Sequence, residues 1–384
     1  MKIGVDLTAL MRQGTGVDTY LLQLVQGLGV VDRRNRYVIF VNREDRDRLP
    51  ALPASFTVVR ACTRNRLVRL AWQQVALPLV AAARRLDVVH SPSFILPVVD
   101  RRARQVLTIH DLTSFSRPGL HDRLRRSWPY RAAVRVSIRL AACICVPSNA
   151  VRDDVLRLVS GVQPDRIRVI RHGISSEFRP EAVGEAQGVR TRLGLASPYL
   201  LFVGTIQPRK NLELLLEAYR RLVLTTAIEE DLVLAGQTGW DCEQVIALAR
   251  TPELRRRVHL LGYVDQRALP GLYAGARAFV YPSLEEGFGL PPLEAMACGV
   301  PVVASTSPAL AENLAGAAEL IPADSAEALA EALVRLLGDD RLHARRRREG
   351  LDRVKHFSWE HAARATIGCY EELAGAGNRA AATA

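Results

Sequence analysis

The feature of this sequence that most restricts its fold is a repeated alternation between short β-branched segments and longer amphipathic ones. In the first amphipathic stretch, Leu21, Val25 and Leu28 recur at the spacing of one helix face. Strands that alternate with helices form parallel sheets with helices on both faces, because each crossover between parallel strands needs a long connection. The first half of the chain therefore predicts parallel strands at residues 2–7, 37–41, 56–59, 88–90, 106–110, 144–147 and 168–170.

The alternation stops and then begins again. Residues 178–198 contain two prolines and three glycines with little periodicity, which predicts a domain boundary near this segment. A second series follows, with strands expected at residues 199–203, 232–235, 258–261, 279–281, 301–304 and 319–321. We therefore expect an α/β fold with two Rossmann-like domains, residues 1–180 and 181–355, and a last helix within residues 356–384. A chain of 384 residues is long enough for two domains.

The strongest local pattern lies at residues 281–299, where a strand is followed by a loop and a helix. Gly287 and Gly289 allow the loop backbone to approach a ligand, and two prolines are typical of a first helical turn. Glu286 precedes the glycines, and Glu294 is expected in the first turn of the helix. Both carboxylates can then border one pocket at the carboxyl end of the strand. In the alternative interpretation, Glu294 interacts with the helix dipole and Glu286 is a loop residue exposed to solvent. That interpretation does not explain why two glycines and two prolines occur in this order.

Two further segments contain candidate site residues. In residues 203–211, a strand and a glycine turn precede Arg209 and Lys210 at an expected helix start. Two cations beside backbone N–H groups can hold a diphosphate, although a solvated pair that caps the helix explains the same pattern. His110 ends an apolar strand and is either structural or functional. Gly16 follows the first strand without the third glycine of a dinucleotide fingerprint, so NAD binding is not predicted.

Charge and cysteine content bound the partners and the metal chemistry. The net charge is +12, and residues 1–181 carry 30 lysines and arginines against 15 acidic residues. Such an excess can attract nucleic acid, an anionic membrane or a diphosphate-bearing acceptor, and a genome that favours arginine codons explains it without any partner. The six cysteines form no C-x-x-C pair, so buried free thiols are expected. Asp45 and Asp47 match a metal-binding D-x-D pattern, but their arginine-rich surroundings predict a solvated loop.

The segment EGFGLPPLEAMACGVPVV, residues 286–303, resembles the signature of the family-4 glycosyltransferases, also called glycosyl transferases group 1. Residues 203–211 and the histidine–aspartate pair at 110–111 are similar to further motifs of that family. The resemblance implies a GT-B fold, in which two Rossmann-like domains face each other across a cleft. It places the acceptor in residues 1–180 and the nucleotide sugar in residues 181–355, and implies that the final helix crosses back onto the first domain.

The resemblance also implies residue roles. Glu286 and His110 would act at the transferred sugar, with Glu286 supporting charge at the anomeric carbon, and Glu294 would hold the nucleotide ribose. The other implied donor contacts are Arg209, Lys210, Gly287, Phe288, Gly289, Leu290, Gly16 and Val264.

These features together predict a retaining glycosyltransferase. We expect it to move a hexose, mannose or rhamnose, from a nucleoside diphosphate sugar to a glycan or lipid-linked acceptor in polysaccharide or cell-envelope glycan synthesis. No cofactor and no metal are expected, because Arg209, Lys210 and a helix terminus can stabilise the leaving diphosphate. One alternative is another GT-B enzyme. The complete E-x7-E loop disfavours a sugar-nucleotide epimerase, and a total of three lysines disfavours a pyridoxal-phosphate-dependent phosphorylase. The other is a non-catalytic binding protein, which leaves the acidic pair unexplained, and we expect no nucleic-acid partner.

Residues 122–140 combine arginines with aromatic and apolar residues. On a helix, Arg131, Arg135 and Arg139 form one basic stripe beside Val134 and Ile138. This surface can rest on an anionic bilayer, or the helix can pack its apolar side on the sheet and solvate its arginines. The N-terminus resembles a strand instead of a signal peptide, so we expect a cytoplasmic protein, with peripheral membrane contact left open. The membrane interpretation also draws on Arg123, Arg125 and Arg126.

Overall fold

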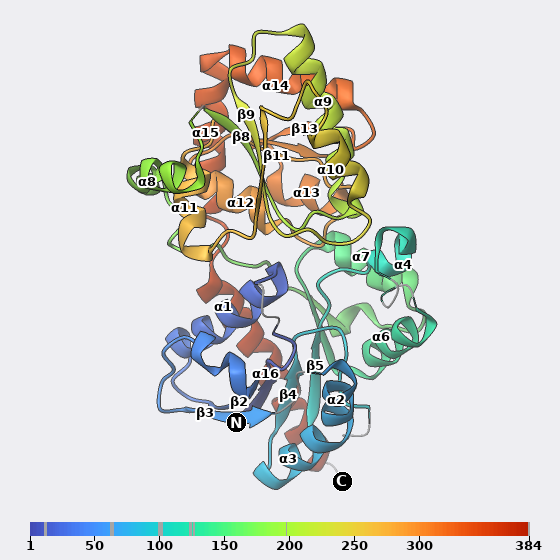
Figure 1. The fold of residues 1–384 in the computed structure, drawn as a ribbon. Helices are drawn as coiled ribbons and strands as arrows, with labels where there is room; N and C mark the ends of the chain where they lie inside the picture. The colour runs from blue at the N-terminus through green and yellow to red at the C-terminus, as the bar shows by residue number, and fades with distance from the viewer. Residues whose placement is uncertain are drawn as a thin grey trace. The chain divides into compact units, whose positions relative to one another are not determined.

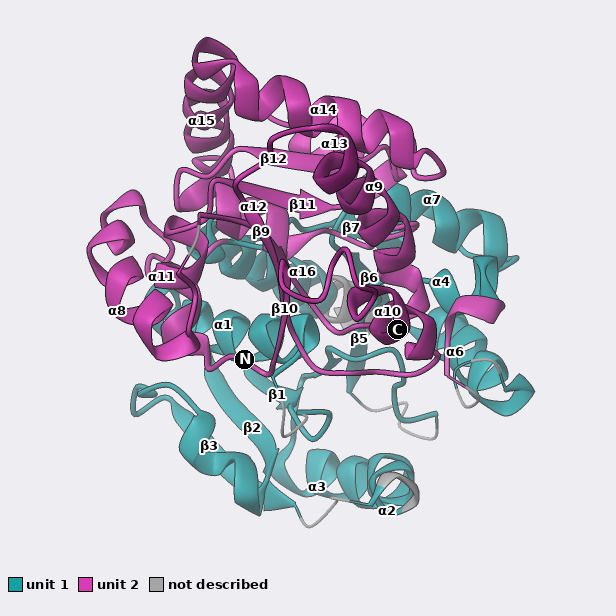
Figure 2. Cartoon of the chain, turned by 45° about the horizontal axis from the view of Figure 1, so that its top comes forward, with its two compact units in different colours: residues 1–118, 123–173, 358–384 teal, residues 119–122, 174–357 magenta. Residues whose placement is uncertain are grey.

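The structure is a computed structural model that describes residues 1–10, 14–61, 65–98, 103–122, 125, 127–196 and 198–382. It consists of two compact units, which Figure 2 shows in teal and magenta. Unit 1 comprises Met1–Pro118, Arg123–Gly173 and Ser358–Ala384, and unit 2 comprises Gly119–Asp122 and Ile174–Phe357. The domain boundaries expected at 180 and 355 therefore both fall inside unit 2.

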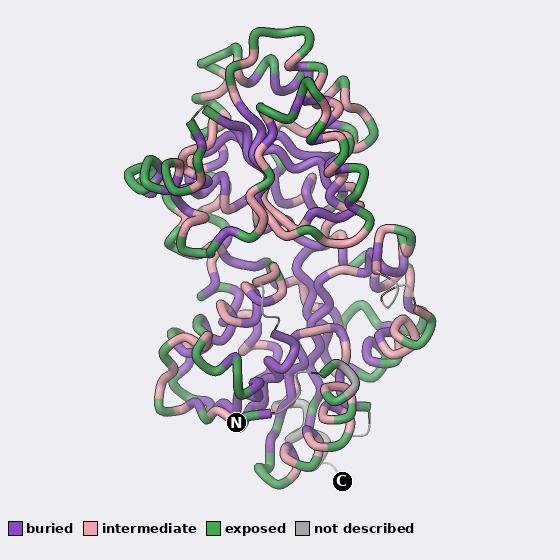
Figure 3. The backbone as a smooth tube through the Cα atoms, viewed as in Figure 1, coloured by how far each residue is buried: buried purple, intermediate pink, exposed green. Residues whose placement is uncertain are grey.

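Unit 1 contains a parallel sheet in the order β3-β2-β1-β4-β5-β6-β7. Its strands carry mostly buried residues, because helices cover both faces and the apolar runs have no face to expose to water (Figures 1 and 3). The strands are β1 (Lys2–Asp6), β2 (Arg36–Asn42), β3 (Phe56–Ala61), β4 (Val88–Ser91), β5 (Arg104–Thr108), β6 (Cys143–Val146) and β7 (Ile167–Val169).

The helices of unit 1 lie between these strands, except for the last one. They are α1 (Gly16–Val31), η1 (Arg43–Arg48), α2 (Arg66–Ala71), η2 (Trp72–Ala76), α3 (Leu77–Arg84), α4 (Thr113–Ser116), α6 (Trp128–Leu140), α7 (Asn149–Leu158), η4 (Pro164–Arg166) and α16 (Trp359–Ala382). The short turn η3 (Pro118–Leu120) begins in unit 1 and ends among the residues assigned to unit 2. Helix α16 follows unit 2 in the chain but packs against α1, β5 and β6. Gly27 permits this contact, since a Cβ there would lie 2.9 Å from the carbonyl oxygen of Trp359.

Unit 2 repeats the same architecture with a six-stranded parallel sheet in the order β10-β9-β8-β11-β12-β13. One apolar core joins the sheet to its flanking helices. The strands are β8 (Tyr199–Val203), β9 (Asp231–Ala235), β10 (Val258–Gly262), β11 (Ala278–Tyr281), β12 (Val302–Ser305) and β13 (Glu319–Ile321). The helices are η5 (Pro180–Ala182), α8 (Val183–Leu193), η6 (Pro208–Lys210), α9 (Leu212–Thr225), α10 (Glu243–Ala249), η7 (Gln266–Ala268), α11 (Leu269–Ala274), α12 (Leu290–Ala297), α13 (Pro308–Leu314), α14 (Ala326–Gly338) and α15 (Asp340–Val354).

Both sheets confirm the predicted α/β fold, and two local expectations need correction. The segment at 178–198 is more than a linker, because it contains α8. Few residues of this helix are buried, among them Ala186 and Val189, so its sequence periodicity is weak. Helix α14 begins after Ser325, whose hydroxyl accepts from the Ala328 backbone amide at 3.0 Å. Strand β5 ends at Thr108, so His110 lies beyond the strand rather than at its end.

Candidate active site

The strand order of unit 2 indicates where a ligand binds. The chain runs outward from β8 to β10 on one side and from β11 to β13 on the other, so the order reverses between β8 and β11. Parallel sheets of this kind bind ligands outside the carboxyl ends of the strands at such a reversal. The loop after β8 carries Arg209 and Lys210, and the loop after β11 carries Glu286. The three charged residues named from the sequence therefore meet at the switch point.

Two glycines keep the loops at this edge close together. Gly204 and Gly236 directly follow β8 and β9, with φ of 152° and 151°. A Cβ on Gly236 would overlap the Gly204 carbonyl, while the Gly236 amide donates to the Gly262 carbonyl at 2.8 Å. At these two positions the end of the sheet therefore carries no side chain, and its backbone can come close to a ligand.

The loop after β8 forms a single 3₁₀ turn rather than the start of an α-helix. Arg209 and Lys210 lie in η6, and α9 begins only after Asn211, which adopts a left-handed conformation with φ of 58°. The Asn211 amide donates to the carbonyl oxygens of Pro282 at 3.2 Å and Ala323 at 2.7 Å. This side chain therefore fixes the cation-bearing turn against the loop after β11.

Glu286 is held between the two cations. Its carboxylate accepts from Arg209 Nη1 at 2.8 Å and from Lys210 Nζ at 2.7 Å, and its side chain is 8% exposed. Burial by itself raises the pKa of Glu286, but the charges of Arg209 and Lys210 outweigh it and the pKa is lowered. The group is therefore a carboxylate at neutral pH, and the three residues together carry one net positive charge.

Tyr281 completes the surroundings of Lys210. It is the last residue of β11 and fully buried, and its hydroxyl oxygen lies 2.5 Å from Lys210 Nζ. The ammonium also lies 4.7 Å from the centre of the Tyr281 ring. Lys210 itself is only 6% exposed, so hydroxyl, ring face and carboxylate compensate the burial of its charge.

The glycine loop presents backbone rather than side chains. Gly289 is the residue before α12 and has φ of 90°, and a Cβ there would overlap Leu310. Phe288 is buried with its ring 5.7 Å from that of Phe357, and its carbonyl oxygen accepts from the Asn313 amide at 2.8 Å. Two of the first three residues of α12 are prolines, so Leu290 alone among them has an N–H. The expected row of helix N–H groups is therefore reduced.

Glu294 lies in the second turn of α12, not in the first, because the helix already begins at Leu290. It accepts from the Tyr273 hydroxyl at 2.9 Å. Burial raises the pKa of Glu294 to about 7, and the Tyr273 hydrogen bond offsets only part of this effect. The two carboxylates of the E-x7-E pattern therefore differ: Glu286 is ionised, and Glu294 titrates near neutral pH.

Val264 follows β10 and is 8% exposed. Its side chain belongs to the apolar core, so only its backbone is available to a ligand. Residues Arg209, Lys210, Glu286 to Leu290, Glu294 and Val264 all belong to unit 2, whereas His110 and Gly16 belong to unit 1.

In unit 1, His110 is buried among aromatic rings. Its Nε2 lies 2.9 Å from the Pro92 carbonyl oxygen, which can only accept, so Nε2 carries the proton. The ring centre lies 4.8 Å from that of Tyr20 and 5.9 Å from that of His172. Burial lowers the pKa of His110, so the imidazole is neutral at neutral pH. Its part in the reaction stays a prediction.

Gly16 is the first residue of α1, and a Cβ there would meet nothing within 4 Å. The glycine that its loop requires is Gly14, which has φ of 55°. Thr15 and Asp18 form a capping box, with the Thr15 amide donating to Asp18 Oδ2 at 2.9 Å. The fold of unit 1 therefore does not require glycine at position 16. The role of Gly16 as a contact to the sugar donor stays a prediction.

Helix α6 buries Val134 and Ile138, as the core-packing interpretation predicts. Arg131 and Arg135 lie over the Phe115 ring at 5.1 and 5.0 Å. Arg125 lies 5.7 Å from the Phe94 ring, while residues 123 and 126 lie outside the described part of the chain. Asp45 is not solvated as expected: it is 8% exposed and accepts from Arg48 at 3.2 Å.

A sequence-based search overlooked the neutral partners of the charged residues. Tyr273, Tyr281, Asn211 and Asn313 each hold a charged side chain or a loop of the site. Tyr281 sits directly before the loop motif and could have been noted, since a buried tyrosine hydroxyl usually finds a hydrogen-bond partner. The asparagines carry no local signal, because their acceptors lie elsewhere in the sequence.

The fold and the site define a class of protein before any comparison. A Rossmann-like unit that places two cations, one carboxylate and a glycine loop at its switch point is built to bind a diphosphate-containing ligand. Unit 1 is also Rossmann-like, and the C-terminal helix α16 belongs to it. Two such units in one chain match the two-domain GT-B architecture.

Comparisons with known proteins agree with this class. Residues 14–178 match the model described as Glycosyltransferase Family 4, and residues 189–353 match the model described as Glycosyl transferases group 1. The O-antigen chain mannosyltransferase B of Escherichia coli is 33% identical, over 94% of this chain and 96% of the relative. The chain therefore belongs to the family-4 glycosyltransferases and is a glycosyltransferase.

Solved structures agree on the fold. Sucrose-phosphate synthase from Thermosynechococcus elongatus superposes with a TM-score of 0.80 at 23% identity, covering 98% of this chain and 99% of that one. HepE from Anabaena, in complex with UDP-glucose, superposes with a TM-score of 0.74 at 17% identity, covering 99% of this chain and all of that one. Both likenesses establish the GT-B fold.

Proposed function

We propose that this glycosyltransferase moves a mannosyl residue from a nucleoside diphosphate sugar to a growing cell-surface polysaccharide, with retention of configuration and without a metal ion. The observation that carries the proposal is the Glu286 carboxylate held between Arg209 and Lys210 at the switch point of unit 2. Support for mannose and for a polysaccharide acceptor comes from the mannosyltransferase of Escherichia coli, which aligns with nearly the whole chain.

The charges of the site favour departure of a diphosphate. As the bond between the sugar and the diphosphate breaks, negative charge grows on the phosphate oxygens and positive charge on the anomeric carbon. Arg209 and Lys210 stabilise the first, and the glycine-loop amides add donors. Glu286 is ionised, so it cannot act as an acid, but its carboxylate can accept from sugar hydroxyls and oppose positive charge on the ring.

Cations that are already placed at the leaving group do the electrostatic work that a divalent ion does in other enzymes. The metal-free part of the proposal rests on this arrangement. The phosphorylase alternative is weaker, because Lys2 is exposed, the Lys355 side chain is 73% exposed, and the buried Lys210 is engaged by Glu286.

The test is hydrolysis and transfer with a panel of GDP-, UDP- and dTDP-sugars, with product configuration read by NMR. We expect the fastest donor turnover with a mannose nucleotide, an α-linked product, and unchanged rates in EDTA. Glu286→Gln serves as the inactive control. A β-linked product from an α-linked donor would contradict retention, and loss of activity in EDTA with recovery in Mn²⁺ would contradict the metal-free mechanism.

A further inference from the structure

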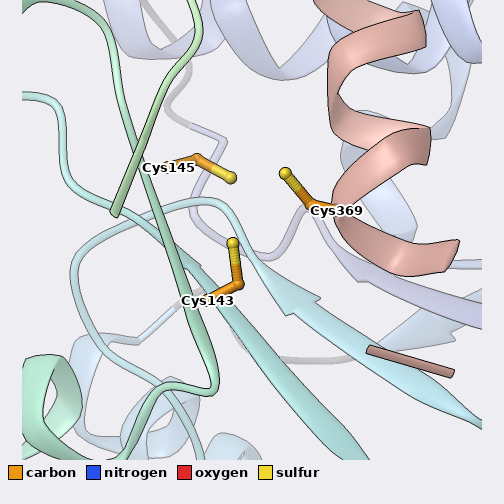
Figure 4. Close-up of side chains that lie close together, drawn as sticks. All are labelled: Cys143, Cys145 and Cys369. Carbon is orange, nitrogen blue, oxygen red and sulfur yellow. The ribbon is translucent and has the colours of Figure 1, made fainter. Parts of the chain in front are cut away.

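Three cysteines of unit 1 gather at one buried point that the transfer reaction does not use. Cys143 and Cys145 lie two residues apart on β6, so both side chains point to the same face of the sheet. Cys369 comes from α16, which covers that face. The three Sγ atoms all lie within 4.8 Å of one another, and Figure 4 shows the side chains converging. Cys143, Cys145 and Cys369 are 5%, 2% and 3% exposed.

The spacing of the sulfur atoms is close to that of a metal site. Metal–sulfur bonds of about 2.3 Å in a trigonal arrangement hold the sulfur atoms about 4.0 Å apart. The observed limit of 4.8 Å therefore requires only a small inward movement of three side chains. Two ligands come from β6, which is paired with a strand on each side, and one comes from the long helix α16.

The donor set selects the kind of ion. Thiolate sulfur prefers soft ions, and structural zinc takes four protein ligands. Among the described residues, no further cysteine, histidine or carboxylate joins the three thiols. A buried site with three sulfur ligands therefore favours an ion that accepts three-coordination, of which copper(I) is the common biological example. Arg168 of β7 pairs with Glu372 of α16 at 2.7 Å, so an ion pair also links this helix to the sheet near the thiols.

We propose that Cys143, Cys145 and Cys369 form a binding site for one soft metal ion, copper(I), that joins α16 to the sheet of unit 1. Each thiol releases its proton as its sulfur binds the ion, so no oxidant or reductant takes part. Because α16 is the segment by which the chain returns to unit 1 after unit 2, the bound ion stabilises unit 1 against loss of its C-terminal helix.

The test is an anaerobic titration of the full chain with copper(I) against a chromogenic copper(I) chelator. We expect one ion per chain and a higher unfolding temperature for the loaded protein. Cys143→Ala, Cys145→Ala and Cys369→Ala should each weaken binding by more than about 100-fold, since even loss of a residue behind a ligand costs about 10–100-fold. Cys242→Ala is the matched control, because Cys242 is an equally buried thiol of unit 2 and should leave affinity unchanged.

Thermal unfolding of each metal-free variant shows whether it is folded, and X-ray absorption on the loaded wild type counts sulfur ligands without any variant. Three sulfur ligands are expected. Failure of the wild type to bind copper(I), two sulfur ligands, or unchanged affinity in the folded variants would overturn the proposal. Zinc binding as tight as that of copper(I) would overturn the choice of ion.

Discussion

Replacing Lys210 by methionine tests whether the buried cation acts on the donor or merely neutralises Glu286. Methionine has nearly the length of lysine but no charge, so it keeps the apolar packing of a side chain that is 8% exposed. The change removes the donor to the Glu286 carboxylate at 2.7 Å and the contact with the Tyr281 hydroxyl at 2.5 Å.

Two magnitudes follow from this geometry. Loss of one placed charge contact at a leaving group lowers turnover by about 100-fold or more. Loss of one partner of a buried ion pair costs about 3–5 kcal/mol of folding stability. We expect the lower end of that range, because Arg209 still lies 2.8 Å from Glu286.

The double variant Lys210→Met/Glu286→Gln separates the two effects. It removes both charges, so more than half of the lost stability should return, whereas turnover should stay at least about 100-fold below wild type. Lys355→Met is the matched control, because that lysine pairs with Asp352 at the surface and its loss should change neither quantity.

Turnover is measured as donor hydrolysis at saturating nucleotide sugar, and stability by urea unfolding of the same preparations. If Lys210→Met keeps turnover within about threefold of wild type, the lysine does not act on the leaving group. If the double variant is no more stable than Lys210→Met, the carboxylate was not left uncompensated and the electrostatic reasoning is wrong.

Three further predictions test other parts of the chain. Burial raises the pKa of Glu294 in the folded state to about 7, so its ionisation should lower the free energy of unfolding by up to about 3 kcal/mol as pH rises from 5 to 8. Urea unfolding at several pH values should show that Glu294→Gln removes this pH dependence, and an unchanged dependence would refute the prediction. Gly289→Ala should lower turnover by at least about tenfold, since its φ is 90° and a Cβ would overlap Leu310, whereas Gly184→Ala, where a Cβ meets nothing within 4 Å, should not. Trp128 on α6 is 78% exposed. In the membrane interpretation of this helix, Trp128→Ser should reduce co-sedimentation of the protein with anionic liposomes at low salt. Absence of binding by the wild-type protein would end that interpretation.

The membrane question illustrates how a structure changes a sequence-based hypothesis. The predicted arginine stripe is partly engaged, since Arg131 and Arg135 stack on Phe115 and Arg139 donates to the Ser160 carbonyl at 3.2 Å. Val134 and Ile138 of α6 are buried, and the apolar residues that stay exposed on this helix are Trp128, Val136 and Leu140, at 78%, 38% and 45%. No helix in the described residues is both long and apolar enough to cross a bilayer. Peripheral membrane contact stays a prediction, which the liposome measurement on Trp128→Ser tests.

Some features of the site followed from local sequence alone. A strand, a glycine turn and a helix at residues 199–225 predicted where Arg209 and Lys210 would lie, and the E-x7-E spacing placed Glu286 and Glu294 around one helix start. Such predictions succeed because period-two and period-3.6 patterns report burial directly, and glycine and proline report backbone geometry.

Other features depended on strand order, which local patterns do not encode. The sequence did not show that β8 and β11 are neighbours, so it could not pair Lys210 with Glu286 or assign the two carboxylates different protonation states. It treated Cys369 as an isolated thiol, because more than two hundred residues separate it from Cys145.

The sequence by itself determined the two α/β series, the family and most of the charged residues of the candidate site, because each is encoded by patterns of residues close in the chain. Only the tertiary structure decided which charges meet, which carboxylate is ionised and where the three thiols converge. Those outcomes depend on burial and on distances between side chains from separate strands and helices, and at such short range a shift of a few ångströms changes an electrostatic interaction from dominant to negligible.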